Sequence, residues 1–488
     1  MKKFITKIKL ITLASIVLPL TAMSADILKT DRLFTEKNYE QAKQGYLEAA
    51  SLGNPHAYYQ LATIYLKGLG VEKDTLNALI YFSLAAEYKF HDAEQIINNM
   101  LSNVSPEEKQ TLTNILSKFN ESNGKQTVMA KYFPIINEKN LAYKVTFEGE
   151  PALETKYHSD EYSDNYEESY STSFSEDGEE EYDDLALLMS TPKQPLIIID
   201  HDVAPDGSIR NIADVQIIGF TKSLIDEFKL FPTLKPDFNK RPVDFVNRVY
   251  LGAAGYSKFT LLEEDKKLYE RIRRAAIKLK ASESLNDKYQ YAMALQNFPW
   301  LNQEDGEVES RLLALSKIGH PGAMYEYGFK LYREQKNIPE AIHWISEASK
   351  YGLARAEYRL ANILLSSPWV ENDEKKALFW FESAMEKNHD AATIKAIDLK
   401  LTANDKSLHD LEGAIDYLSQ IETSQANNPE YYYLLALSHK DRENRDYTQV
   451  IQNLERAISM GQRANWDVSE WQDLLITLTT GRVFISDD

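Results

Sequence analysis

Histidines and carboxylates are the residues of this chain whose chemistry could serve metal binding or acid–base catalysis. The nine histidines include no His-x-x-x-His pair, the spacing that brings two imidazoles to one face of a helix. Asp200, Asp202 and Asp206 superficially suggest a calcium loop. Their oxygen spacing is wrong for one, and Asn211 stands at the twelfth position, where a bidentate Glu is required. We interpret these aspartates as a strand end and a turn, and we expect no metal site and no cofactor.

Motifs for nucleophilic and phosphate chemistry are missing from the sequence. It has no Gly-x-Ser-x-Gly elbow, no Gly-x-x-x-x-Gly-Lys loop and no cysteine. Paired carboxylates are abundant only in one acidic stretch, whereas acid–base catalysis needs them held in a partly desolvated site. We predict a protein that is not an enzyme and has no small-molecule substrate.

Charge is distributed unevenly along the 488 residues, whose formal net charge is −19. Residues 148–184 carry fifteen Asp or Glu and one Lys, and this acidic balance argues against nucleic-acid binding. Residues 154–184 have few large apolar groups other than tyrosines, so we predict a disordered insertion at 150–190. Seven Lys or Arg at helical spacing lie within residues 266–280. We expect either a solvated helix face or an intramolecular contact with acidic residues 150–184.

The N-terminus has the pattern of a secretory signal peptide. Four lysines within residues 2–9 precede an apolar run from Leu10 to Leu20, and small residues lead to Ala25. The apolar run is too short for a spanning helix, which needs about 20 residues. We expect export to the periplasm with cleavage before Ala25. An uncleaved signal that anchors the chain in the inner membrane is the alternative.

A helical spacing recurs every 36 or 37 residues. In one of the clearest copies, Asp74 is followed by Ala78, Tyr81 and Ala85. The first residue caps a helix, the alanines let a neighbouring helix approach, and the aromatic residue fills the space between them. The period predicts pairs of antiparallel helices stacked as a solenoid. Copies begin at Asn38, Asp74, Asn337, Asp373, Asp410 and Asp446.

Fifteen residues after most of these starts comes a residue that tolerates a left-handed, helix-ending conformation. These residues are Gly53, Gly352, Asn388 and Gly461, with Lys89 as the exception.

From Asn54 to Ala93 the sequence resembles the Sel-one-like repeat family, relatives of tetratricopeptide repeats, with Gly68 and Gly70 in the expected loop. The resemblance covers roughly 26–122 and 285–475. It implies a surface on the first helix of each pair that can hold a protein partner. Candidate anchors on these helices are Tyr58, Tyr325 and Tyr358.

The middle of the chain has a different pattern. Apolar strands at 196–203 and 208–218 flank an Asp-Gly turn, followed by an amphipathic helix at 221–230 and a strand at 242–250. This order resembles the C-terminal domain of the TonB energy-transducer family. The matching motifs are Asp206-Gly207-Ser208, Phe228, Phe231-Pro232, Asn239-Lys240-Arg241-Pro242-Val243 and, at its start, Tyr132-Phe133-Pro134.

The TonB resemblance implies that an extended peptide can add to an exposed sheet edge. The candidate edge residues are Lys240, Arg241, Val243, Phe245 and Asn247. The chain lacks the long Pro-rich spacer of that family and the histidine in its N-terminal apolar segment. We therefore do not expect the chain to transduce energy itself.

These observations predict a mainly α protein, in which two α/α solenoid arrays flank a small α+β domain with the order strand-strand-helix-strand. The expected domains are a signal peptide at 1–24, Sel-one-like repeats at 25–122, a TonB-like domain at 128–255 interrupted by the insertion at 150–190, and a C-terminal array at 260–488.

The predicted function is that of an exported adaptor of the cell envelope, linked to TonB-type outer-membrane transport. Its expected partners are proteins such as outer-membrane receptors or TonB-system components. The alternative is a structural scaffold for envelope assembly with no TonB-linked role. A hydrolase regulator, or an enzyme whose site is assembled from unrelated positions, is the third hypothesis.

Overall fold

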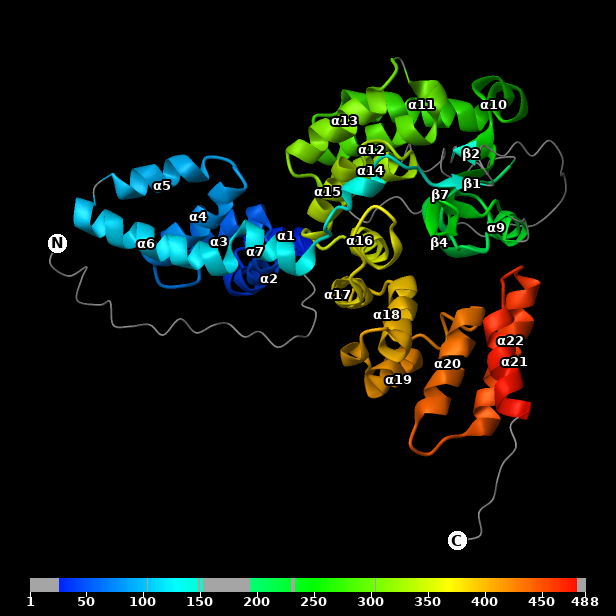
Figure 1. Ribbon diagram of the computed structural model, residues 1–488. Coiled ribbons are helices and arrows are strands. Elements are labelled where there is room, and N and C mark those ends of the chain that lie inside the picture. The colour runs from blue at the N-terminus through cyan, green and yellow to red at the C-terminus, as the bar shows by residue number, and fades with distance from the viewer. Residues whose placement is uncertain are drawn as a thin grey trace, which may run out of the picture.

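The computed structural model describes residues 26–102, 104–147, 150–151, 194–229, 233–302 and 304–480. Two groups of helices flank a small region of strands in the sequence (Figure 1). The predicted fold class, mainly α with two helical arrays and a small α+β region, is confirmed. The expected signal peptide lies outside the described residues. The expected acidic insertion at 150–190 also lies outside them, apart from residues 150 and 151.

The N-terminal array is a run of helices in which α2, α3 and α4 pack against one another in order. Figure 1 shows it in blue and cyan, on one side of the rest of the molecule. Its helices are α1 (Ile27–Thr35), α2 (Tyr39–Ser51), α3 (Pro55–Lys67), α4 (Thr75–Glu87), α5 (Ala93–Leu101), α6 (Pro106–Asn123) and α7 (Lys125–Tyr132).

The C-terminal array continues the chain after the strands. Neighbouring helices pack as pairs, most extensively α14 with α15, α16 with α17 and α20 with α21. Its helices are α10 (Lys258–Glu264), α11 (Lys266–Ala281), α12 (Leu285–Asn297), α13 (Glu307–Lys317), α14 (Pro321–Arg333), α15 (Ile338–Ser349), α16 (Ala354–Ser366), α17 (Glu374–Met385), α18 (Asp390–Thr402), α19 (Leu411–Gln420), α20 (Pro429–Asp441), α21 (Tyr447–Arg463) and α22 (Ser469–Thr480).

Most of the predicted helix starts are capped. The Asp74 carboxylate accepts from the backbone N–H groups of Leu76 and Asn77, and Asp373, Asp410 and Asp446 cap their helices in the same way. Asn38 and Asn337 stand at the expected positions but make no side-chain cap.

The predicted helix ends also hold in most copies. Gly53, Gly352 and Asn388 have positive φ, and so does Lys89 at 54°, although it is not a glycine. Gly461 differs, because α21 continues through it to Arg463.

The central sheet consists of β3 (Leu196–Val203), β4 (Ile209–Ile218) and β7 (Phe245–Gly252), all antiparallel, in the order β4-β3-β7. Gly207 lies in the β3–β4 turn with φ of 83°, where a Cβ would come within 2.7 Å of the Thr233 carbonyl oxygen. Helix α9 (Lys222–Phe228) packs on one face of the sheet, and α10 and α11 pack on the other. The predicted order strand, strand, helix, strand is therefore present.

A second, smaller sheet was not predicted. It has the order β2-β1-β5-β6, from β1 (Thr146–Phe147), β2 (Glu150–Pro151), β5 (Pro236–Phe238) and β6 (Arg241–Pro242). Because β5 and β6 form a hairpin, the expected strand at 242–250 is split, and β7 begins only at Phe245.

Residues 132–145 lie along the C-terminal array rather than on the central sheet. The indole N–H of Trp380 donates to the Tyr132 carbonyl oxygen at 2.7 Å, and Lys376 donates to that of Phe133 at 3.0 Å. Phe133 is fully buried near Trp380. Assigning Tyr132-Phe133-Pro134 to the start of a TonB-like domain was therefore wrong, because this motif packs on α17.

Candidate protein-binding site

The central sheet packs directly on helices α14 and α16 of the C-terminal array. Asp202 of β3 accepts hydrogen bonds from the Tyr358 hydroxyl at 2.5 Å and from the Arg359 guanidinium at 2.7 Å. Asn211 of β4 donates to the Tyr358 hydroxyl at 2.7 Å. The chain's own sheet thus occupies this surface of the array.

A buried ion pair makes a second set of contacts across the same interface. Arg248 of β7 donates to both oxygens of Asp200, at 2.6 and 2.8 Å, and to Glu326 of α14 at 3.0 Å. Burial opposes its charge, but the carboxylates of Asp200 and Glu326 outweigh burial and raise the pKa of Arg248 above its usual value. The Arg248 guanidinium also lies 5.7 Å from the ring centre of Phe329.

The three tyrosines proposed as anchors are all buried. Tyr58, Tyr325 and Tyr358 are 2%, 3% and 4% exposed, and Tyr58 packs near Tyr81 and Tyr88. In this arrangement they are not available to a partner, because neighbouring repeats and the sheet already cover them.

The proposed edge residues have mixed environments. Lys240 and Arg241 are exposed, but they belong to the β5–β6 hairpin, while Val243 is partly buried. Phe245 is buried and stacks on Tyr332 of α14, with ring centres 5.8 Å apart.

Among the described strands, β7 pairs only with β3 and so lies at an edge of the central sheet. The Asn247 side chain accepts from the backbone N–H of Arg248 at 2.9 Å. That N–H therefore points away from β3. Strand β4 forms the opposite edge and is interrupted by two irregularities in register, a feature that discourages pairing with another strand.

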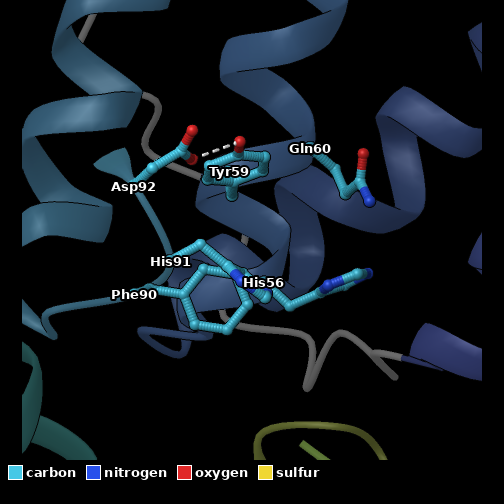
Figure 2. A pocket seen from close by; sticks show the side chains of 6 residues that line it. All are labelled: His56, Tyr59, Gln60, Phe90, His91 and Asp92. Carbon is cyan, nitrogen blue, oxygen red and sulfur yellow. Dashed lines mark hydrogen bonds between the residues drawn. The ribbon is translucent and has the colours of Figure 1, made fainter. Parts of the chain in front are cut away.

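An open hollow of about 510 Å³ lies on the N-terminal array. Figure 2 shows its lining side chains, three from α3 and three from the turn between α4 and α5. They are His56, Tyr59, Gln60, Phe90, His91 and Asp92.

Local geometry positions these side chains. Lys89 and His91 both have positive φ, which folds the α4–α5 turn tightly toward α3. The ring centre of Tyr59 lies 5.9 Å from that of Phe90 and 5.6 Å from that of His91. The Tyr59 hydroxyl donates to the Asp92 carboxylate at 2.7 Å. Burial and the hydrogen bond to Asp92 raise the pKa of Tyr59 to about 12, so the phenol stays neutral.

The hollow occupies repeat positions that contact the sheet in the other array. Counting from the helix-ending glycines Gly53, Gly319 and Gly352, the sixth and seventh residues are Tyr59-Gln60, Tyr325-Glu326 and Tyr358-Arg359. Glu326, Tyr358 and Arg359 bind the sheet, whereas Tyr59 and Gln60 line an open hollow.

Sequence reasoning missed this site by one residue. It selected Tyr58, which is buried, instead of its neighbour Tyr59. The repeat register contained the necessary signal, because Tyr59 is the residue equivalent to Tyr325 and Tyr358. The contribution of Phe90, His91 and Asp92 had no comparable signal, since it depends on the left-handed turn that holds them.

Comparison with known families identifies the helical units. A family model described as the Sel1 repeat matches residues 30–54, 55–87, 313–352 and 354–389. The chain therefore contains Sel1-like helical repeats in both arrays. No curated protein matches it significantly.

Two solved structures are similar to this chain. A Sel1 repeat protein from Oxalobacter formigenes has 16% identity and a TM-score of 0.32, covering 47% of this chain and 91% of its own. The second is c5321, a protective antigen of uropathogenic Escherichia coli strains displaying an SLR fold. It has 14% identity and a TM-score of 0.29, covering 95% of this chain and 87% of its own.

The Sel1 matches include the helices that make both surfaces. The match at 55–87 contains α3, and those at 313–352 and 354–389 contain α14 and α16.

Within the described residues no cluster of three or more His, Asp or Glu is arranged to hold a metal ion. None of the helices in those same ranges is long and apolar enough to cross a membrane.

Proposed function

We propose that this Sel1-like protein is a non-enzymatic adaptor that binds a protein partner at the hollow on α3. One observation carries the proposal. At equivalent repeat positions the C-terminal array binds the chain's own sheet, while the N-terminal array leaves an aromatic hollow open. Sel1 repeat proteins are in general protein-interaction adaptors, which agrees with this assignment.

Site-directed photo-crosslinking tests the proposal. A photoreactive residue replaces Gln60, which lines the hollow, and in a matched variant it replaces Gln44, which is exposed on α2 of the same array. We expect one defined protein crosslinked from position 60 in living cells and a much weaker product from position 44. Equal products from both positions, or none from position 60, would contradict the proposal.

We further propose that the adaptor works in the cell envelope, after export with removal of residues 1–24. The lysine-rich, apolar start of the sequence supports this proposal. N-terminal sequencing of the protein from the periplasmic fraction should begin at Ala25. An intact N-terminus in the membrane fraction would instead support an anchored form.

A link to TonB-type transport through strand addition is a finer part of the proposal. Among the described strands β7 pairs on one side alone, which supports this part, because the N–H of Arg248 points away from β3. Strand alternation places the N–H of Val246 on the same side. Val246→Pro would therefore remove an outward donor while sparing the pairing with β3. We expect this folded variant to lose binding of outer-membrane receptor peptides, and retained binding would exclude this edge.

We also propose that acidic residues 150–184 contact the basic face of α11. Charge complementarity supports this, since Lys266, Lys267 and Arg273 are all exposed. Small-angle scattering should then show a larger maximum dimension at 500 mM than at 50 mM salt. The contact is excluded if this dimension does not change.

A further inference from the structure

The hollow on α3 combines aromatic rings with one fixed carboxylate. Tyr59, Phe90 and His91 supply ring faces and edges, and Asp92 is held in place by the Tyr59 hydroxyl. Among the residues that the structure describes, no lysine or arginine lines the hollow. Such a surface attracts a cation, because aromatic faces and carboxylates both carry negative potential.

A second carboxylate, that of Asp31, contacts His56 of the hollow. Asp31 accepts through Oδ1 from the Tyr46 hydroxyl at 2.6 Å, and the same oxygen lies 2.9 Å from His56 Nε2. Within the part of the chain that the structure describes, the second oxygen of Asp31 and that of Asp92 have no recorded hydrogen-bond partner. Both carboxylates are therefore fixed by one oxygen and retain an acceptor on the other.

The other array shows what an equivalent position can bind. Arg248, which projects from strand β7, meets the Glu326 carboxylate at 3.0 Å and lies beside the Phe329 ring. Glu326 is the repeat equivalent of Gln60. An arginine from a strand, held by a carboxylate and an aromatic ring, is thus already bound once within this molecule.

We propose that the hollow binds an arginine side chain of the partner. The planar guanidinium can stack on the Phe90 ring while it donates to the free oxygen of Asp92. Gln60 provides a neutral amide where the other array has Glu326, so Asp92 supplies the negative charge. This inference rests on the proposed adaptor function and adds the chemical identity of the group recognised.

Histidine-detected NMR of the full chain tests the inference. The protein is labelled with carbon-13 at the histidine Cε1 atoms, and the signals of His56 and His91 are assigned from His→Gln variants. The probe is the capped tripeptide Gly-Arg-Gly. Two comparison peptides carry lysine or citrulline in place of arginine, and citrulline keeps the shape of arginine without its charge.

We expect the arginine peptide to shift the His56 and His91 signals in a saturable manner. The citrulline peptide should bind at least about 10-fold more weakly, since it lacks the charge that the carboxylates and rings attract. Asp92→Asn, which keeps an acceptor for Tyr59, should weaken arginine binding about 5- to 10-fold, whereas Asp305→Asn on an exposed loop should not.

Three results would overturn the inference: unchanged His56 and His91 signals, equal affinity for arginine and citrulline, or tighter binding of lysine than of arginine. Failure here is distinguishable from failure of the adaptor function. A crosslinked partner at position 60 without arginine binding would support the adaptor function and contradict the arginine site. Arginine binding without a crosslinked partner would support the arginine site and contradict the adaptor function.

Discussion

The two helical arrays present equivalent residues to different neighbours. In the C-terminal array, Tyr358 and Glu326 face the chain's own sheet and are buried. In the N-terminal array, Tyr59 occupies the repeat position of Tyr358, and it lines an open hollow. The difference shows that a repeat register can identify a binding position without showing whether another part of the chain already fills it.

The occupied surface is also chemically different from the open one. Its contacts are buried ion pairs and short hydrogen bonds, whose loss leaves charges away from water. The hollow has aromatic rings and the carboxylate of Asp92, which solvent can reach. Substitutions should therefore affect stability strongly at the first surface and binding at the second.

The largest effect is expected from Arg248→Ala. This change removes the ion-pair partner of Asp200 and leaves Glu326 with Arg355 alone, at 3.9 Å. Losing one member of a buried pair costs roughly 3–5 kcal/mol. Urea unfolding measures the loss. Arg311→Ala, which removes a more exposed pair with Glu307, should cost less than about 1 kcal/mol. Similar costs for the two variants would show that the sheet interface is no tighter than the protein surface.

The second-largest effect is expected from acid, which should lower the stability of the central sheet and of the helices around it. Burial lowers the pKa of His201 from 6.5 to about 4 and that of His389 likewise to about 4. The unfolded chain binds these protons more readily than the folded chain. The contribution of each neutral histidine to stability is therefore complete above pH 6.5 and is lost as the pH falls toward 4. The expected loss is about 3 kcal/mol at most for each histidine.

Thermal unfolding between pH 7 and pH 4 tests this dependence. His201→Leu removes the buried imidazole of β3 and should flatten the profile. A profile with the same slope in His201→Leu would show that this histidine does not control acid stability.

A third, smaller effect is expected from Tyr358→Phe. The variant removes the hydroxyl that bonds Asp202 and Asn211, and a lost buried hydrogen bond to a charged group costs about 1.5–3 kcal/mol. Tyr447→Phe, at an exposed position on α21, provides the control. A cost as small as that of the control would mean that the sheet does not depend on this contact.

The sequence was sufficient for features that depend on local chemistry. Asp74 and Asp373 cap helices because a carboxylate can accept from the first free N–H groups, wherever the helix lies. Asp206-Gly207 forms the predicted turn for a similarly local reason. Period and turn chemistry thus predicted the arrays and the order of the central strands.

The sequence was insufficient where distant segments meet. Asp202 and Arg359 are 157 residues apart and Arg248 and Glu326 are 78 apart, so no spacing indicated that the sheet covers the C-terminal array. The hollow depends on Lys89, which takes a left-handed conformation that its residue type does not favour. The small second sheet likewise joins short strands on either side of residues 152–193.

The smallest expected effect on stability comes from Tyr59→Phe, and it sharpens the comparison with Tyr358→Phe. Both variants remove a hydroxyl that donates to an aspartate, at 2.7 Å in one case and 2.5 Å in the other. Asp92 is exposed and can bond water instead, so Tyr59→Phe should cost less than about 1 kcal/mol in urea unfolding. The same variant frees Asp92 to move, and it should reduce crosslinking from position 60. A loss of stability equal to that of Tyr358→Phe would show that the hollow is a structural contact like its counterpart, and not an open binding position.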